Sequence, residues 1–208
     1  MPLLLVLWTA CTGVERLHTA TPPAGEAPLV TGADILWFDL DGGDRLDLIS
    51  SCASTCPHDG NDNAVASLTT WAVDWTWLGH RTEPCVVVSP DVHVDVTVAL
   101  PRWSPPAGTD PALIAEWGTY TTALARHEQG HVDLVYDVAR DSADGLAGVP
   151  CIDAHAASAG LLTDLRQVQA AYDVETRHGR TQGADFWHLE GRAVAQAEAT
   201  SGAPTATQ

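Results

Sequence analysis

The sequence predicts a domain of the α+β class, in which a small antiparallel sheet is followed by long helices. Two stretches, residues 71–77 and 92–100, alternate apolar and polar side chains as half-buried strands do. After Asp110-Pro111 the apolar residues change to helical spacing and keep it to about Leu146, and residues 161–172 form a second helical stripe. Strands that come first and helices that come later are typical of α+β domains.

Shorter elements complete this prediction. Residues 35–40 form a strand that Gly42-Gly43 ends, and residues 44–52 form a short helix. The row of tryptophans in 71–77 is expected to face the core. We expect Gly118 to kink or split the first long helix, the second long helix to begin between residues 153 and 159, and Gly179 to cap it.

The ends of the chain differ in composition from its middle. Residues 1–30 contain a short apolar run, then Thr9-Ala10-Cys11, then a Pro- and Gly-rich stretch, which predicts an export signal or lipoprotein leader and a flexible tether. In this hypothesis Cys11 carries a lipid anchor, although no basic residue precedes the run. We expect residues 31–190 to form a single domain and residues 191–208 to form a flexible tail.

Export leaves four cysteines for disulfides. Three connectivities are possible, and we favour Cys52–Cys56, which closes a small loop, with Cys85–Cys151, which joins the sheet to the helices. Disulfides persist outside the reducing cytoplasm. The expected location is therefore the periplasm, the outer membrane as a lipoprotein, or the extracellular space.

The chain is strongly acidic. Its net charge is −17, and all ten of its cationic side chains are arginines, because it has no lysine. No basic stripe is present, so nucleic acids and anionic membrane surfaces are not expected partners. The composition identifies neither a substrate nor an oligomeric state.

Residues 127–131 read His-Glu-Gln-Gly-His, which is the H-E-x-x-H pattern of zinc hydrolases. On a helix, His127 and His131 lie on the same side, one turn apart, so that both imidazoles can bind one zinc ion (Zn2+). The carboxylate of Glu128 can then accept a proton from water that zinc has made more acidic. The motif lies inside the long helical pattern, which favours a zinc site over a solvated helix face that carries these residues by chance.

A catalytic zinc site needs a third protein ligand and an open position. His178 lies where the second helix ends, beside a glycine that lets the chain turn. The candidates after the motif are His155, Asp164, Asp173, Glu175, His178 and His188.

Residues 172–179 read Tyr-Asp-Val-Glu-Thr-Arg-His-Gly. Together with the H-E-x-x-H helix and Ala-Leu-Pro-Arg-Trp at 99–103, this segment resembles a family of bacterial proteins described as predicted secreted zinc-dependent proteases, a domain of unknown function. The resemblance covers roughly residues 30–190. It implies that His178 is the third zinc ligand and that Tyr172 is a candidate for stabilising the oxyanion, with a purely structural aromatic of the core as the alternative for Tyr172.

Helix geometry bears on this third ligand. Because an α-helix rises about 1.5 Å per residue, His178 comes near His131 only if the second helix starts late or the connecting loop is long. If that helix starts at Asp153, Asp164 lies closer. We favour His178 and keep Asp164 and Glu175 as the next positions to test.

These observations predict an exported zinc-dependent metallopeptidase that acts on a peptide or protein substrate, with Glu128 as general base. Its single zincin-like metallopeptidase domain is expected to span residues 31–190. An edge strand of the sheet can hold an extended peptide. Two alternatives stay open. One is a non-catalytic envelope binding or scaffold protein, whose structural zinc would have four protein ligands. The other is a zinc hydrolase acting on a non-peptide amide, such as one in a cell-wall fragment.

Overall fold

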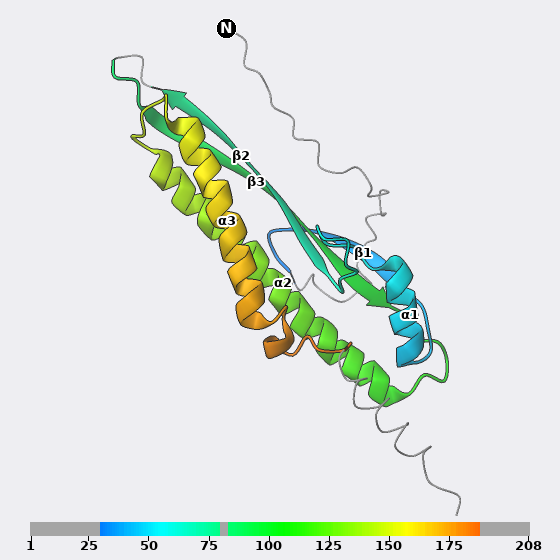
Figure 1. The fold of residues 1–208 in the computed structure, drawn as a ribbon. Helices are drawn as coiled ribbons and strands as arrows, with labels where there is room; N and C mark the ends of the chain where they lie inside the picture. Colours follow the sequence, from blue (N-terminus) through cyan, green and yellow to red (C-terminus); the bar gives the residue numbers. More distant parts are fainter. Residues whose placement is uncertain (1–29, 80–82, 188–208) are drawn as a thin grey trace, which may run out of the picture.

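A computed structural model of the chain describes residues 30–79 and 83–187 (Figure 1). In this part of the chain, strands precede two long helices, so the α+β class is confirmed. Cys11, His188 and nearly all of the expected leader, tether and tail lie outside the described residues. The elements are β1 (Asp34–Leu40), α1 (Arg45–Thr55), β2 (Leu68–Gly79), β3 (Val87–Trp103), α2 (Pro111–Leu146), α3 (Ala154–Thr176) and the 3-10 turn η1 (Arg180–Gln182).

The described strands form one mixed sheet in the order β1-β3-β2. β2 and β3 pair antiparallel as a long hairpin, whereas β1 pairs parallel with β3. The expectation of a wholly antiparallel sheet is therefore wrong for β1. Parallel neighbours need a crossover connection, and the segment containing α1 supplies it by carrying the chain from one edge of the sheet to the other.

One face of the sheet packs against the long helices, and Figure 1 shows α2 and α3 lying along the β2–β3 hairpin. Val73 on β2 and Val96 and Val98 on β3 are buried on this face. Trp71 and Trp75 pack against the same core, which confirms that the tryptophan row faces inward. Because side chains alternate along a strand, the intervening residues face the other side of the sheet.

α2 is the longest element and carries the H-E-x-x-H motif. The side chain of Asp110 accepts a hydrogen bond from the backbone N–H of Ala112, and Pro111 occupies the first helical position, as the sequence predicted. The helix continues through Gly118, so the expected split is wrong. A glycine in a helix costs about 1 kcal/mol relative to alanine but keeps its backbone N–H, so the hydrogen-bond ladder is not broken.

α3 begins at Ala154, at the early end of the expected range, and runs back along α2. Its end is formed by Arg177 and His178, both of which have left-handed backbone conformations with φ of 51° and 52°. Gly179 follows with φ of 78°. The cap therefore lies two residues before the expected glycine, and the chain reverses its direction immediately after α3.

Both expected disulfides are formed. Cys52–Cys56 closes the end of α1, and Cys85–Cys151 joins the tip of the β2–β3 hairpin to the loop between α2 and α3. The backbone N–H of Cys151 also donates to the carbonyl of Cys85 at 3.0 Å. In the part of the chain that the structure describes, no helix is long and apolar enough to cross a membrane.

The two disulfides should contribute unequally to stability. Cys85–Cys151 joins residues 66 positions apart, and Cys52–Cys56 joins residues 4 positions apart. For these loops the chain-entropy relation gives stabilisation of roughly 4 and roughly 2 kcal/mol, respectively. We expect the paired substitution of Cys85 and Cys151 by serine to lower the free energy of unfolding about twice as much as the pair at Cys52 and Cys56. Denaturant unfolding of the metal-free proteins measures this, and equal losses would contradict it.

Candidate metal centre

The two long helices bring their polar residues to the same height. His127 lies nineteen residues before the end of α2, and Asp173 lies nineteen residues after the start of α3. By the same count Gln169 is level with His131, because His131 lies fifteen residues before the end of α2 and Gln169 lies fifteen residues after the start of α3. Because both helices rise about 1.5 Å per residue, an antiparallel pair places these residues opposite one another.

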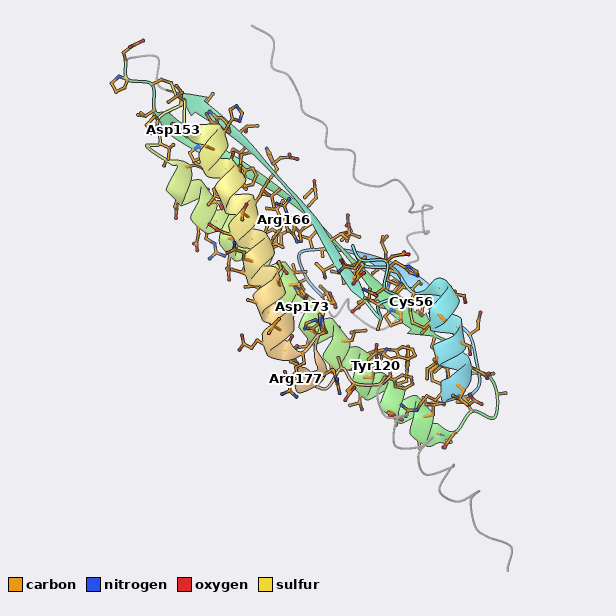
Figure 2. The ribbon with its side chains drawn as sticks, in the orientation of Figure 1. Cys56, Tyr120, Asp153, Arg166, Asp173 and Arg177 are labelled. Carbon is orange, nitrogen blue, oxygen red and sulfur yellow. A yellow bond between two sulfur atoms is a disulfide. The ribbon has the colours of Figure 1, made fainter. Side chains whose placement is uncertain are left out.

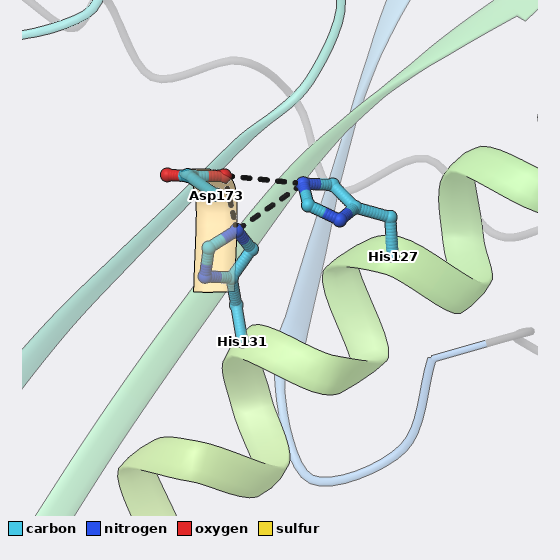
Figure 3. A group of neighbouring side chains, drawn as sticks. All are labelled: His127, His131 and Asp173. Carbon is cyan, nitrogen blue, oxygen red and sulfur yellow. Dashed lines mark hydrogen bonds and ion pairs between the residues drawn. The ribbon is translucent and has the colours of Figure 1, made fainter. Parts of the chain in front are cut away.

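Three electron-rich atoms meet at this height (Figure 3). The Nε2 atoms of His127 and His131 lie 3.3 Å apart, and Asp173 Oδ1 lies 3.4 Å from the first and 3.1 Å from the second. Both histidines are buried, and Asp173 is half-buried. These three residues form a group of the kind that holds a metal ion.

Gln169 determines which nitrogen of His131 carries a proton. Its side-chain Nε2 donates to the backbone carbonyl of His131 at 2.9 Å, so its Oε1 is the atom left to face the imidazole. This oxygen makes a short contact with His131 Nδ1. An amide oxygen only accepts, so Nδ1 must be the donor and Nε2 keeps its lone pair in the neutral ring.

A second glutamine, which Tyr172 orients, determines which nitrogen of His127 carries a proton. The hydroxyl of Tyr172 donates to the backbone carbonyl of His127 at 3.2 Å and accepts from Gln182 Nε2 at 3.0 Å. Gln182 Oε1 then lies 3.1 Å from His127 Nδ1 and accepts its proton. Burial raises the pKa of Tyr172, so its hydroxyl retains the proton that this chain of hydrogen bonds requires. When neutral, both imidazoles thus turn unprotonated Nε2 atoms toward each other.

This arrangement fits a zinc ion. Two nitrogen lone pairs and a carboxylate repel one another at such short range unless a cation or a proton lies between them. Ligands in a tetrahedral zinc site, with zinc–nitrogen distances of about 2.0–2.1 Å, are separated by about 3.3–3.4 Å. The observed separations of 3.1–3.4 Å match this edge length.

Without a metal ion, a proton can take this place. Burial raises the pKa of Asp173, but hydrogen bonds from His127 and His131 outweigh burial and hold that pKa well below its usual range. Burial lowers the pKa of His131, but its hydrogen bonds with Asp173 and Gln169 and the charge of Glu128 outweigh burial and raise it. A metal ion that binds here therefore displaces a proton.

His178, the expected third ligand, lies next to this group but outside it. Its Nδ1 is 3.4 Å from Asp173 Oδ1, and its side chain is 80% exposed. The reason is the helix register: α3 ends at Thr176, so His178 lies beyond the height of the two histidines, whereas Asp173 faces them. The same register leaves Asp164 exposed and far up the helix, so an early start of α3 does not bring it to the motif.

Tyr172 packs against His127, and its hydroxyl is not directed into the site as a role in oxyanion stabilisation would require. Its ring stacks on the imidazole of His127, with 5.1 Å between centroids and 10° between planes, and its hydroxyl points at the backbone of α2. A Cβ atom on Gly130 would lie only 2.1 Å from that hydroxyl. Gly130, the second variable position of the motif, therefore leaves the space that Tyr172 occupies, and any larger residue there would collide with Tyr172.

Glu128 is held by the sheet. Ser67 Oγ donates to Glu128 Oε1 and Thr69 Oγ1 donates to Oε2, each at 2.5 Å. Glu128 itself is only 3% exposed. Its carboxylate is therefore held at the start of β2, and Glu128 lines the same cleft as the two histidines of α2.

A cleft of about 900 Å³ opens onto the site. Residues 64–69, the last two of which begin β2, line this cleft together with Glu128 and Asp173. Figure 2 labels three of the lining residues: Tyr120 on α2, Asp173 on α3 and Arg177 at the end of α3. The larger apolar side chains of the lining are Leu68, Trp71, Tyr120, Leu124 and Trp187.

Sequence reasoning missed the hydrogen-bond partners of the site. Ser67 and Thr69 extend the inward-facing row of β2 toward its start, since side chains two positions apart share a face. Hydroxyl residues in a row that otherwise carries tryptophans were a usable signal of polar contacts there. Gln169 lies four residues before Asp173 and so on the same face of α3. Gln182 had no such signal, because only the reversal of the chain after α3 brings it to His127.

Comparison with known families adds one finding. The family described as "Bacterial protein of unknown function (DUF922)" matches residues 35–179, which is more than half of the chain. The matched range contains both the H-E-x-x-H helix and the segment from Tyr172 to Gly179. No curated protein and no solved structure matches the chain. The family description assigns no activity, so the protease stays a prediction.

Gly130→Ala should weaken metal binding without unfolding the protein. The new methyl group would displace Tyr172 and break its hydrogen bonds to His127 and Gln182, and loss of such supporting contacts typically costs 10- to 100-fold in metal affinity. Gly118→Ala is the matched control, because nothing lies within 4 Å of a Cβ atom there. That variant should be more stable by roughly 0.5–1 kcal/mol and bind zinc as wild type does. Zinc titration with a competing chelator measures both, and equal affinities would contradict the role of Tyr172.

Metal-free and zinc-loaded protein should respond oppositely to pH. The raised pKa of His131 stabilises the metal-free protein fully below the ordinary value of 6.5, and this contribution is lost as pH rises through the raised value. Zinc affinity instead increases with pH, because the ligands must lose protons. We therefore expect His131→Asn to destabilise metal-free protein more below pH 6.5 than at alkaline pH. Thermal unfolding across pH tests this, and a constant difference would contradict it.

Proposed function

This chain belongs to the bacterial DUF922 family, and we propose that it is a zinc-dependent hydrolase that cleaves peptide bonds. One observation carries the proposal: two imidazole Nε2 atoms and a carboxylate oxygen lie within 3.4 Å of one another, and their residues line one cleft with the buried Glu128. Three protein ligands with a cleft in front of them are the arrangement of catalytic zinc sites, whereas structural sites are closed by four.

Each residue has a role in this proposal. His127, His131 and Asp173 hold the ion, which when bound acts as a Lewis acid and lowers the pKa of water in its open position. Glu128 orients a water molecule with one carboxylate oxygen and accepts its proton as that water attacks the substrate carbonyl. Tyr172, expected from the family resemblance to stabilise the oxyanion, here holds His127 instead, because its hydroxyl is directed at the helix backbone.

The surroundings of the cleft support a peptide substrate. β2 is an edge strand of the described sheet, and its first residues line the cleft beside Glu128. An extended peptide can pair with such an edge through backbone hydrogen bonds, which places a peptide bond near the metal centre. Trp71, Leu124 and Trp187 offer apolar surface for its side chains. A small non-peptide amide would use less of this surface.

The disulfides support a location outside the cytoplasm. Cys52–Cys56 and Cys85–Cys151 are both formed, and such bonds persist in oxidising compartments. We propose an exported protein that works in the periplasm, on the outer membrane as a lipoprotein, or outside the cell.

Glu128→Gln should retain zinc and lose hydrolysis, because Glu128 is a proton acceptor and not a ligand. General-base catalysis typically contributes 10²- to 10⁴-fold, so we expect a loss of about that size. The measurement is zinc content together with cleavage of an unfolded protein substrate by zinc-loaded protein. If wild type binds zinc but cleaves nothing in a broad peptide library, the protein is a binding or scaffold protein and the proposal fails.

The third ligand can be assigned by comparing two variants. Asp173→Ala removes an atom that faces both histidines, so we expect zinc affinity to fall more than 100-fold. His178→Ala removes a neighbour of Asp173, for which a loss of 10- to 100-fold or less is expected. Zinc titration of both variants decides between them. A larger loss in His178→Ala would assign the third position to His178, as the family resemblance implies.

A further inference from the structure

We propose that Ser67 and Thr69 are positioning residues that fix the carboxylate of Glu128 in its working orientation. The inference rests on the proposed function, since it assigns these residues to the same reaction. Its basis is the pair of hydrogen bonds in which each hydroxyl donates to a different oxygen of Glu128, both at 2.5 Å.

The geometry of β2 makes this pair possible. Ser67 immediately precedes the strand and Thr69 is its second residue, so the two side chains are two positions apart and lie on the same face. This is the face that also carries Trp71 and Val73 toward the helices. Two hydroxyls thus stand at the end of an otherwise apolar row, at the point where that row reaches Glu128.

The helix alone does not fix the carboxylate. A glutamate side chain has three rotatable bonds, and its last torsion has a broad distribution of angles. A general base must nevertheless lie within about 2.6–3.2 Å of the proton that it accepts. Two donors on two different oxygens remove the freedom of that last torsion. Ser67 and Thr69 therefore supply from the sheet the orientation that α2 cannot supply.

The same contacts leave Glu128 able to act as a base. Each carboxylate oxygen has two lone-pair positions, and one hydroxyl on each leaves the second position for water. The hydroxyls are neutral, so they hold the carboxylate without cancelling its charge as a guanidinium would. The pair therefore positions the base and does not block it.

The next residue along the strand provides an internal control. Thr70 has the same side chain as Thr69 but faces the other side of the sheet, where it is exposed. Its Oγ1 lies 3.5 Å from the carbonyl of Thr97 on β3. A substitution at Thr70 therefore changes strand propensity and hydroxyl content as a substitution at Thr69 does, but leaves Glu128 untouched.

The first test uses full-length, zinc-loaded protein. Thr69→Val and Ser67→Ala should each lower kcat about 10- to 100-fold, the range for residues that orient catalytic groups, with KM and zinc affinity unchanged. Thr69→Ser should restore most of the loss, and Thr70→Val should have no effect. Thermal unfolding identifies any variant that does not fold. An unchanged or increased kcat in folded Thr69→Val and Ser67→Ala would overturn the proposal.

A second readout does not depend on activity. In protein labelled with carbon-13 at the glutamate carboxyl groups, the Glu128 signal is identified by its absence from Glu128→Gln. Thr69→Val should move that signal and Thr70→Val should not. If zinc-loaded wild type hydrolyses nothing, the proposed function fails, and this signal alone then decides whether the hydroxyls hold Glu128. A signal that stays in place in Thr69→Val would overturn the contact itself.

Discussion

Two nitrogen lone pairs and a carboxylate oxygen face one another at 3.1–3.4 Å between α2 and α3, and the rest of the domain depends on making that placement tolerable. Like-charged and electron-rich atoms repel at this range, most strongly where little water reaches them. The surrounding hydrogen bonds prevent the side chains from moving apart to relieve this repulsion. Gln169 and Gln182 hold the other nitrogens of the two rings, so neither ring can turn away without breaking a bond. A cation between the three atoms resolves the repulsion.

The fold provides the precision that this placement requires. α2 and α3 are antiparallel, and their register decides which side chains are level. The Cys85–Cys151 disulfide joins the loop between them to the far end of the β2–β3 hairpin. At the other end of β2, Ser67 and Thr69 contact Glu128. The sheet and the helix pair are thus connected at both ends of β2, and the candidate metal centre lies at one of these connections.

Local patterns were sufficient to predict part of this structure. The alternation in β2 and β3, the cap at Asp110 and the motif residues His127 and His131 all depend on neighbours close in sequence, where periodicity is informative. Both disulfides were also predicted. The parallel pairing of β1 could not be read from its residues, because it depends on where the α1 segment crosses the sheet.

The third ligand and Gln182 lay beyond such patterns. Asp173 and His178 are only five positions apart, and the start of α3 decides which of them faces the motif. That start was known only to within several residues. Gln182 reaches His127 because Arg177 and His178 adopt left-handed conformations that turn the chain back. Few non-glycine residues adopt such a conformation, although histidine does so more often than most, and two in succession could not be predicted from local preference.

The most direct measurement is the location and identity of the bound metal ion. Crystals of the protein grown with one equivalent of zinc, with diffraction measured on both sides of the zinc absorption edge, would show it as an anomalous peak. We predict a peak at about 2.0–2.2 Å from the Nε2 atoms of His127 and His131 and from an oxygen of Asp173. A peak at another place, or no peak between the two histidines in zinc-saturated crystals, would contradict the metal centre.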